Sequence, residues 1–381
     1  MKKKIAFCTG TRAEYGLLKP LMELVLHDPD LEFELYVTGM HLSLEFGHTI
    51  DEILQDKIPV TEKVEILVSG DTPSAISKSM GLAMIGFGDV FARRKPDMLV
   101  LLGDRFEAFC AAAAATVARV PIAHLHGGEL TLGAIDDAFR HSITKMSSLH
   151  FTSTEEYRHR VIQMGEEPSR VFNVGALGVE NILKLPLMTL KELEKSLGVR
   201  FKTPYALVTY HPATLDDMDP ENQILELLNA LDSFPGLFLV FTKANADAGG
   251  RVINKLIDDY VSKNMERAVV FSNMGQIQYL SAMKFASMVI GNSSSGIIET
   301  PSFGVPTVNI GKRQEGRVKA KSVFACAVET KSIRKAITEV QATARNKQDQ
   351  VSNPYYGKDT AKTIYKIIRD FLLAGITNKG F

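Results

Sequence analysis

Several groups of polar side chains in this 381-residue chain directly follow short apolar runs. In the first, Gly10-Thr-Arg-Ala-Glu-Tyr-Gly16, Arg12 follows the run Ile5–Cys8 and stands where a helix would begin. A helix start offers free backbone N–H groups to an anion, and an arginine adds a charge-assisted contact. The segment is therefore a candidate anion site, with a plain strand-to-helix turn as the alternative.

A second group, Asp104 and Arg105, follows the hydrophobic run Met98–Leu102. A carboxylate that leaves a sheet at this point can act as an acid or base on a bound substrate. It can also cap the helix that follows, which aspartate does well. Both interpretations stay open, because capping does not exclude catalysis.

The third group is the richest in acid and base side chains, with His124, His126 and Glu129 in the segment HLHGGE and Asp136 soon after it. In a strand, positions 124 and 126 would point to the same face. Acid–base chemistry is the preferred interpretation, with a core position more natural for His124. A metal site made of His124, His126 and Asp136 is a less favoured alternative, because no HExxH-type signature accompanies it. Asp136 could also begin the helix that carries Arg140.

Three further groups lie in the second half of the chain. His211 follows an apolar run and precedes Pro212, which favours extended backbone. The serine loop, which we define as Gly291-Asn-Ser-Ser-Ser-Gly-Ile-Ile-Glu299, offers three hydroxyls and free N–H groups to one anion, and Glu299 could bind a ribose diol. It is neither GxxxxGK[ST] nor GxGxxG, so neither ATP hydrolysis nor NAD binding is favoured. Arg313, in a cation-rich segment after the next apolar run, could reach the same phosphate.

Short β-branched runs alternate with amphipathic stretches along the whole chain, which predicts an α/β fold with parallel sheets covered on both faces. Thirteen strand candidates fit two sheets of six or seven strands better than one wide sheet. We therefore expect two doubly wound, Rossmann-like domains, residues 1–177 and 178–381, with a ligand cleft between them. The final helix, residues 360–373, could pack back on the first domain.

Composition narrows the classes of function. The chain has 44 basic and 44 acidic residues, and this balance argues against a general nucleic-acid binder. Its three cysteines, Cys8, Cys110 and Cys326, form no CxxC pair and are expected to be reduced core residues. No signal-peptide core follows Met1-Lys-Lys-Lys4, and we find no run of the ~18 apolar residues that a membrane span needs. A soluble cytoplasmic protein is expected.

At these residues the sequence resembles the UDP-N-acetylglucosamine 2-epimerase family, most closely its hydrolysing branch in bacterial sialic-acid biosynthesis. The resemblance covers nearly the whole chain. It rests on GTRAEYG (Gly10–Gly16), VTGMH (Val37–His41), LGDR (Leu102–Arg105), HLHGGE (His124–Glu129), RHSITKMS (Arg140–Ser147), TSTEEY (Thr152–Tyr157), GNSSSGIIE (Gly291–Glu299) and SNPYY (Ser352–Tyr356). The family implies a glycosyltransferase-B-like fold, a homodimer or dimer of dimers, and no metal or other cofactor.

The resemblance also implies a reaction, in which UDP leaves UDP-N-acetylglucosamine by elimination and water then adds to give N-acetylmannosamine. It assigns catalytic roles to Asp104, Asp136 and His211. It assigns substrate binding to Arg12, His41, Arg105, Ser293, Ser294, Ser295, Gly296, Glu299 and Arg313. Many members have Glu where this chain has His126, so either His126 or Glu129 must supply the base.

Other activities remain open at this stage. The sugar could be a UDP-linked 2,4-diacetamido-trideoxy-glucose. A non-hydrolysing epimerase would return a UDP-sugar, a glycosyltransferase would need an acceptor, and a UDP-sugar sensor would release no UDP. The density of acid and base groups near His126 and Asp104 argues against the sensor.

Overall fold

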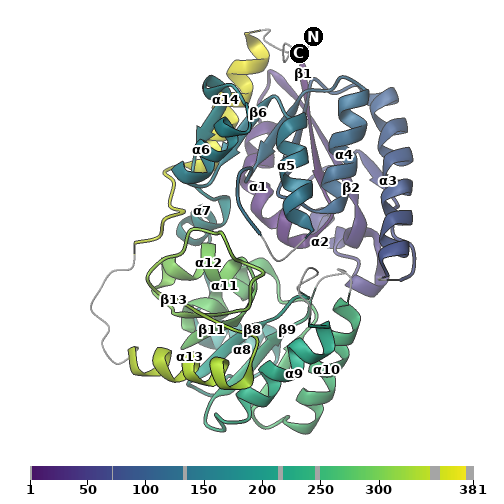
Figure 1. Cartoon of the computed structure of the whole chain (residues 1–381). Coiled ribbons are helices and arrows are strands. Elements are labelled where there is room, and N and C mark those ends of the chain that lie inside the picture. The colour runs from purple at the N-terminus through teal and green to yellow at the C-terminus, as the bar shows by residue number, and fades with distance from the viewer. Residues whose placement is uncertain are drawn as a thin grey trace. The chain divides into compact units, whose positions relative to one another are not determined.

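The computed structural model describes residues 2–70, 72–131, 135–212, 218–244, 249–343 and 352–374. Within these residues the chain forms two compact units, each with one parallel β-sheet covered by helices (Figure 1). The α/β class and the two-sheet arrangement expected from the alternating pattern are confirmed. We describe the units separately as unit 1 (Met1–Glu129, Asp136–Glu180 and Tyr355–Phe381) and unit 2 (Leu130–Ile135 and Asn181–Pro354).

The described residues of unit 1 build a seven-stranded sheet in the order β3-β2-β1-β4-β5-β6-β7. Its strands are β1 (Lys3–Thr9), β2 (Leu31–Thr38), β3 (Glu62–Val64), β4 (Met98–Leu102), β5 (Ile122–Leu125), β6 (Leu149–Thr152) and β7 (Val171–Asn173). Its helices are α1 (Arg12–Leu26), α2 (Ile50–Gln55), α3 (Pro73–Arg94), α4 (Phe106–Val117), α5 (Asp136–Met146), α6 (Glu155–Gln163), α14 (Thr360–Leu373) and the first half of α7 (Leu177–Lys184). The central strands are buried on both faces, which explains their continuous apolar runs.

The described residues of unit 2 build a six-stranded parallel sheet in the order β10-β9-β8-β11-β12-β13. Its strands are β8 (Tyr205–Thr209), β9 (Phe238–Thr242), β10 (Ala268–Phe271), β11 (Met288–Gly291), β12 (Thr307–Ile310) and β13 (Val323–Cys326). Its helices are α8 (Leu190–Leu197), α9 (Pro220–Leu231), α10 (Gly250–Lys263), α11 (Gln276–Phe285), α12 (Ser295–Ile298) and α13 (Thr330–Thr343).

Helix α14 returns the chain to unit 1 after all of unit 2. Its apolar face, including Ile364 and Ile368, joins the core around α1 and β1. Asp28 accepts hydrogen bonds from Tyr365 Oη at 2.5 Å and from Arg369 Nε at 3.0 Å. The structure thus divides the chain at residues 180 and 181, against 177 and 178 in the sequence-based division, and groups α14 with unit 1.

Two sequence-based expectations for unit 1 need correction. The apolar residues between Val64 and Gly70 predict a strand over that range, but β3 covers only Glu62–Val64 and pairs in register with the end of β2. A short edge strand leaves few unpaired backbone groups exposed, and Gly70 already lies near the start of α3. The sequence was also expected to contain no run long and apolar enough to span a membrane, but helix α3 has that length and composition. About a third of its most apolar stretch is buried inside the protein.

Candidate active site

Each sheet has one point at which the strand order reverses, and parallel α/β sheets bind ligands outside the carboxyl ends of the strands at such points. In unit 1 the reversal lies between β1 and β4, whose ends lead to Arg12 and Asp104. In unit 2 it lies between β8 and β11, whose ends lead to His211 and the serine loop. The topology therefore places Arg12, Asp104, His211 and the serine loop at the two reversal points. His126 follows β5 and Arg313 follows β12, the strands next to these points.

Asp104 of unit 1 is held by an ion pair. Arg140, which is almost completely buried, directs Nη2 at the Asp104 carboxylate, and its Nη1 donates to the Glu129 carbonyl at 2.9 Å. The N-cap of α4 is Arg105, so the alternative in which Asp104 caps this helix is wrong. A carboxylate fixed by a buried guanidinium and still partly exposed is suited to meet a substrate.

The two histidines of HLHGGE have different surroundings. The Nε2–H group of His124 donates to the Gly103 carbonyl at 2.7 Å, and its Nδ1 lies 3.1 Å from Thr144 Oγ1. Burial lowers the pKa of His124 to about 3, so its ring is neutral. His124 therefore supports the Gly103 turn that presents Asp104, and the core interpretation fits this residue.

His126 lies one residue beyond β5 and has a left-handed backbone, with φ of 65°. The alternation that would place it on the same face as His124 does not extend to it, so that expectation is wrong. Its Nδ1 lies 3.1 Å from Glu129 Oε1, which also accepts from Ser153 Oγ at 2.8 Å. Its buried Nε2 has no hydrogen-bond partner among the described residues. A non-glycine residue held at positive φ, with a free ring nitrogen, is typical of functional sites.

The loops after β1 and β2 bring Arg12 and His41 near each other. His41 is fully buried between Thr9 Oγ1 at 3.1 Å and Thr49 Oγ1 at 2.8 Å. Burial is the main cause that lowers its pKa to about 4, with the Arg12 charge adding to the effect. A neutral His41 therefore positions the Gly10–Arg12 turn, while Arg12 Nε lies 3.0 Å from Glu52 Oε2.

An acidic pair that was not among the sequence-based candidates, Glu14 and Glu107, lies beneath this turn. Glu14 Oε2 accepts from the N–H groups of Gly10 at 2.8 Å and Thr11 at 3.0 Å. Burial, and then the charge of Glu107, raise the pKa of Glu14 to about 7. Glu107 itself is buried and accepts from Arg105 at 3.1 Å, so Arg105 is directed at this pair. Glu14 falls at the capping-box position three residues after Thr11, and that spacing is a signal that could have identified it.

Asp136 is the first residue of α5 and is partly exposed, close in sequence to the ion-paired Asp137. No group of three or more His, Cys, Asp or Glu side chains in the described ranges is placed to hold a metal ion. Both ring nitrogens of His124 are already engaged, so the geometry gives no support to a metal held by His124, His126 and Asp136.

In unit 2, Asn292 joins the ends of β8 and β11. Its Oδ1 accepts from the His211 N–H and its Nδ2 donates to the His211 carbonyl, both at 2.7 Å. Gly291 has φ of 138°, and a Cβ there would lie 1.8 Å from the Thr209 carbonyl oxygen. Only glycine fits this close approach. The serine loop and His211 are therefore fixed to each other.

The serine loop continues into the short helix α12. Ser294 is its N-cap and Ser295 and Gly296 begin it, while Ser293 Oγ accepts weakly from the Ser295 N–H at 3.4 Å. Gly296 is packed against Thr307, whose Oγ1 donates to the Gly296 carbonyl at 2.8 Å. The three serine hydroxyls therefore lie together at the N-terminus of α12.

Arg313, Gln314 and Tyr279 surround the same loop. Arg313 Nη1 and Gln314 Nε2 donate to the Asn292 carbonyl at 3.2 and 2.9 Å, and Arg313 Nε has no hydrogen-bond partner among the described residues. Burial, and then the Glu299 charge, raise the pKa of Tyr279 to about 12, so its hydroxyl stays protonated. Arg313 thus lies beside the serine loop, as its sequence position suggested. Tyr279 and Gln314 carried no sequence signal of their own.

Comparisons with known proteins agree with this arrangement. The family model described as UDP-N-acetylglucosamine 2-epimerase matches residues 25–369. The chain is 46% identical over 323 residues to GDP/UDP-N,N'-diacetylbacillosamine 2-epimerase (hydrolyzing) of Campylobacter jejuni, covering 85% of this chain and 84% of that protein. It is 41% identical to polysialic acid biosynthesis protein P7 of Escherichia coli, covering 97% and 94%.

A structural comparison supports the fold. The crystal structure of UDP-GlcNAc 2-epimerase from Neisseria meningitidis, bound to UDP-GlcNAc, superposes with a TM-score of 0.78 at 18% identity and covers 97% of this chain and 100% of that one. The two-sheet architecture of this chain is of the glycosyltransferase-B type, as the family resemblance implied. The extent of the family match and the identity to hydrolysing relatives lead to one conclusion: this chain is an enzyme of the UDP-N-acetylglucosamine 2-epimerase family and belongs to its hydrolysing branch.

Proposed function

We propose that the protein converts UDP-N-acetylglucosamine and water into UDP and N-acetylmannosamine. A base removes the proton on sugar carbon 2 while the bond from carbon 1 to the UDP oxygen breaks, leaving a 2-acetamidoglucal. Water then adds its oxygen to carbon 1, and a proton returns to the opposite face of carbon 2. The observation that carries this proposal is the Asp104 carboxylate, held by a buried arginine beside the paired His126 and Glu129.

Unit 1 supplies the acid and base groups in this proposal. Asp104 and Asp136 exchange protons with the sugar, and the pair His126–Glu129 replaces the glutamate base of many family members. His126 Nε2 is the atom best suited to take a proton, because it is buried and has no partner in the described part of the chain. His211 of unit 2 assists, since its backbone is fixed by Asn292.

Unit 2 supplies the groups that accept the leaving UDP. Ser293, Ser294 and Arg313 hold the diphosphate, because hydroxyl and guanidinium donors stabilise the negative charge that develops as UDP departs. Glu299 accepts hydrogen bonds from the ribose, and Ser295 and Gly296 shape the loop. Arg12, His41 and Arg105 of unit 1 complete the substrate-binding set.

A second sugar is a serious candidate. The Campylobacter relative is named for N,N'-diacetylbacillosamine and is more similar to this chain than the polysialic acid protein. UDP-linked 2,4-diacetamido-trideoxy-glucose would undergo the same elimination, because only carbons 1 and 2 react. Parallel assays of UDP release with both sugar nucleotides identify the preferred substrate by the larger kcat/KM.

We further propose that the enzyme works in the cytoplasm, as a homodimer or dimer of dimers, and supplies N-acetylmannosamine to sialic-acid or surface-polysaccharide synthesis. Its three cysteines are free, which suits a reducing compartment. The Escherichia coli relative is named for polysialic acid biosynthesis, which supports the pathway.

Isotopic labelling tests the reaction. In heavy water, one deuterium should appear at carbon 2 of the free sugar. In ¹⁸O-labelled water, the label should appear on the anomeric oxygen and not on UDP, because the carbon–oxygen bond breaks. An ¹⁸O label in UDP would mean attack at phosphorus and would contradict the elimination. A UDP-linked epimer as the product would instead indicate a non-hydrolysing enzyme.

Two variants assign the base. If His126 takes the proton, His126→Ala should abolish deuterium exchange at carbon 2 while Glu129→Ala retains part of it. The reverse result would assign the base to Glu129. UDP affinity provides the control, because neither side chain belongs to the proposed diphosphate site, and it should be unchanged in both variants.

A further inference from the structure

Ser153 is a buried polar residue that the proposed function does not use. It follows β6 and directly precedes Thr154, the N-cap of α6 (Figure 1). Ser153 is 1% exposed, and its Oγ donates to Glu129 Oε1 at 2.8 Å. A hydrogen bond to an ionised group is stronger than one between neutral groups, and it is directional. The serine hydroxyl therefore fixes the direction in which the buried Glu129 carboxylate points.

Glu129 Oε1 is the atom at which two contacts meet. It accepts from Ser153, and it lies 3.1 Å from His126 Nδ1. A carboxylate offers only lone pairs, so the ring nitrogen that faces it is the one that carries hydrogen. His126 Nε2 then keeps its lone pair, and this atom is buried without a hydrogen-bond partner in the described part of the chain. That lone pair is what a base needs.

The backbone of the HLHGGE loop is held by β6 and α6 as well. The His126 N–H donates to the Phe151 carbonyl at 2.8 Å. Gly128 has φ of 77°, and a Cβ there would lie 2.5 Å from the Tyr157 carbonyl oxygen. Arg160 Nη1 donates to the Gly128 carbonyl at 2.5 Å. These contacts fix the path of the loop but not the rotation of its side chains.

The other charged and titratable groups around the loop have different partners. His124 of β5 is neutral and engages both ring nitrogens. Arg140 of α5 donates to the Glu129 carbonyl, and Arg160 of α6 donates to the Gly128 carbonyl. Both cations thus hold the backbone of the loop, whereas the serine hydroxyl acts on the carboxylate itself.

We propose that Ser153 is a positioning residue for the proton transfer at carbon 2. It holds Glu129 Oε1 against His126 Nδ1 and thereby keeps the Nε2 lone pair available. The inference rests on the proposed function, in which His126 is the base. It also gives the segment TSTEEY (Thr152–Tyr157) a role that the family resemblance did not assign.

The proton transfer accounts for the need to orient the carboxylate. As Nε2 takes the proton from carbon 2, the electron pair of that C–H bond forms the double bond between carbons 1 and 2, and the UDP oxygen leaves with its own pair. The His126 ring becomes an imidazolium ion, and the Glu129 carboxylate stabilises its charge. In hydrolases with a serine, histidine and aspartate, a buried carboxylate holds the imidazole in the productive tautomer in the same way.

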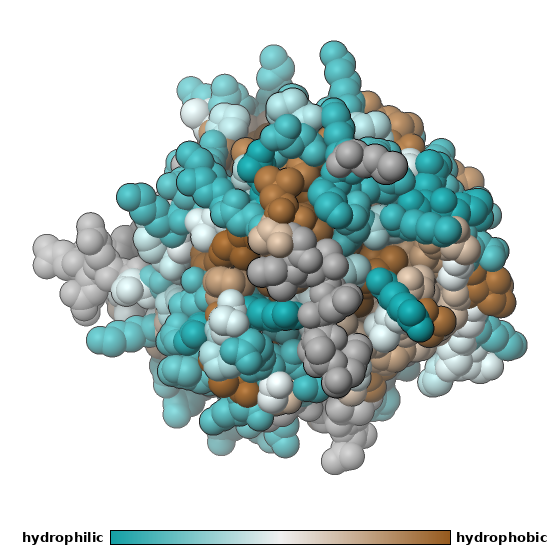
Figure 2. Space-filling view, turned by 90° about the horizontal axis from the view of Figure 1, so that it is seen from above, coloured by the Kyte–Doolittle hydropathy of each residue, from teal (hydrophilic) through white to brown (hydrophobic). Residues whose placement is uncertain are grey.

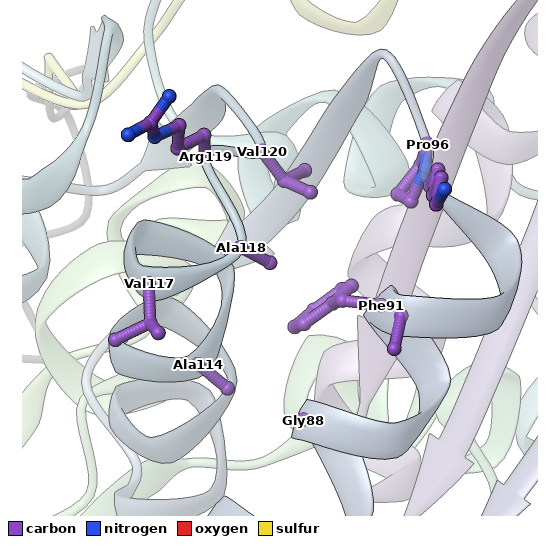
Figure 3. Close-up of a pocket in the computed structure, with 10 residues that line it drawn as sticks. Gly88, Phe91, Pro96, Ala114, Val117, Ala118, Arg119 and Val120 are labelled. Atoms are coloured by element: carbon purple, nitrogen blue, oxygen red, sulfur yellow. The ribbon is translucent and has the colours of Figure 1, made fainter.

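This orientation is an interior feature of unit 1. Figure 2 shows a face of the molecule on which hydrophilic side chains predominate, with apolar ones among them. Figure 3 shows a groove of about 430 Å³ between α3 and α4, lined mostly by apolar side chains. Pro96 and Val120 of its lining precede β4 and β5, so the groove lies at the amino ends of these strands. Asp104 and His126 follow the carboxyl ends of the same strands, so variants of Ser153 test the base without altering the groove.

Nitrogen NMR of the full chain with ¹⁵N-labelled histidine tests the orientation without using activity. The signals of His126 are identified by their loss in His126→Gln. In the neutral wild-type ring, hydrogen should be on Nδ1. Glu129→Gln should move it to Nε2, because the amide can donate to Nδ1, and Ser153→Ala should give a mixture of both tautomers. A wild-type ring with hydrogen on Nε2, or an unchanged tautomer in Ser153→Ala, would overturn the proposal.

Steady-state kinetics tests the effect on the reaction. Ser153→Ala should lower kcat roughly tenfold and leave KM and UDP affinity unchanged, because a misdirected base affects only the chemical step. Deuterium incorporation at carbon 2 should slow by the same factor, and Ser153→Thr, which keeps the hydroxyl, should recover kcat. Ser147→Ala is the matched control, since Ser147 is also fully buried but donates to the Ile143 carbonyl at 2.7 Å. It should retain the wild-type kcat.

The variants also separate this inference from the proposed function. If His126→Ala retained deuterium exchange, the proposed base would be wrong, and with it the role of Ser153. If His126→Ala abolished exchange while Ser153→Ala kept the wild-type kcat, the base would stand and the positioning role would be rejected. An equal loss of kcat in Ser153→Ala and Ser147→Ala would also reject it, because the effect would then be one of buried serines in general.

Discussion

The reversal points of the two sheets have the same topology but different side chains. In unit 1, charged and titratable groups predominate, with Asp104 paired to Arg140 and His126 paired to Glu129. In unit 2, hydroxyls and amides predominate, with Asn292 joining two strands and three consecutive serines beside Arg313. In the proposed function, the first point moves protons and the second holds the leaving anion, with His211 as its one acid–base side chain. The same scaffold thus serves two tasks through the residues that follow its strands.

The largest effect should come from removing an acid–base group of unit 1. Asp104→Asn should lower turnover about 10²- to 10⁴-fold while UDP affinity is retained, because the amide cannot exchange the proton. Steady-state kinetics and calorimetric titration with UDP measure the two quantities. Asp137→Asn is the control, since Asp137 also contacts Arg140 at 3.2 Å but has no proposed proton role. Equal losses in both variants would reduce Asp104 to a structural partner of Arg140.

A second difference between the two units should appear in their stability at acidic pH. His41 is buried and neutral with a pKa of about 4, against 6.5 in the unfolded chain. Below pH 6.5 the unfolded state takes up a proton that the folded state does not, so stability falls until pH 4 and then levels off. The loss is about 3 kcal/mol for this histidine.

Hydrogen exchange measured by mass spectrometry from pH 7 to pH 4 would detect this loss. Protection in β1 and β2 of unit 1 should fall before protection in β8 and β11 of unit 2. His41→Gln should reduce the slope in unit 1. If unit 2 opened first in the wild type, buried neutral histidines would not be what distinguishes the units in acid.

The anion site of unit 2 should show an intermediate effect. Arg313→Ala removes a charged donor worth about 1.5–3 kcal/mol, so UDP should bind tenfold or more weakly. Lys312→Ala removes a neighbouring exposed cation and should change UDP affinity little. Titration calorimetry on both variants compares them directly. An equal loss in both would indicate general attraction by the cationic segment and not a specific contact.

The smallest effect should come from Tyr279. Its hydroxyl stays protonated at neutral pH, because its pKa is about 12, and it lies within hydrogen-bonding reach of Ser293 and Ser295. Tyr279→Phe keeps the ring and removes one neutral hydrogen-bonding group, worth about 1 kcal/mol. UDP affinity should therefore fall only a few-fold, which calorimetry can resolve. A loss as large as that of Arg313→Ala would mean that Tyr279 contacts the ligand itself.

Much of the fold was predictable because buried parallel strands are continuous apolar runs. The hydrophobic run Met98–Leu102 coincides with β4, and the run Ile5–Cys8 lies inside β1. The strand expected after Val64 failed because Ile66 is apolar and buried without being paired in the sheet. Burial and strand pairing give the same sequence signal at a sheet edge, so the pattern alone cannot separate them.

The site was predictable to the extent that its residues follow strands. Asp104, His126 and the serine loop were found by this rule, whereas Arg140 and Tyr279 were not assigned to the site because they lie within helices. The left-handed backbone of His126 has no signal in its residue type. The contacts that Arg140 and Tyr279 make with the site depend on which face of a helix packs against which strand end. No local pattern in a single sequence shows that packing.

The position of α14 has a consequence for synthesis on the ribosome. Ile364 and Ile368 of this helix complete the core of unit 1, yet they are translated after every strand of unit 2. Domains that are continuous in sequence can fold as they emerge, usually in order from the N-terminus. Here the order is inverted, because unit 2 has all of its strands before unit 1 receives its last helix. The apolar surface of α1 therefore stays uncovered while unit 2 is being made, and a chaperone that shields it would act during that interval.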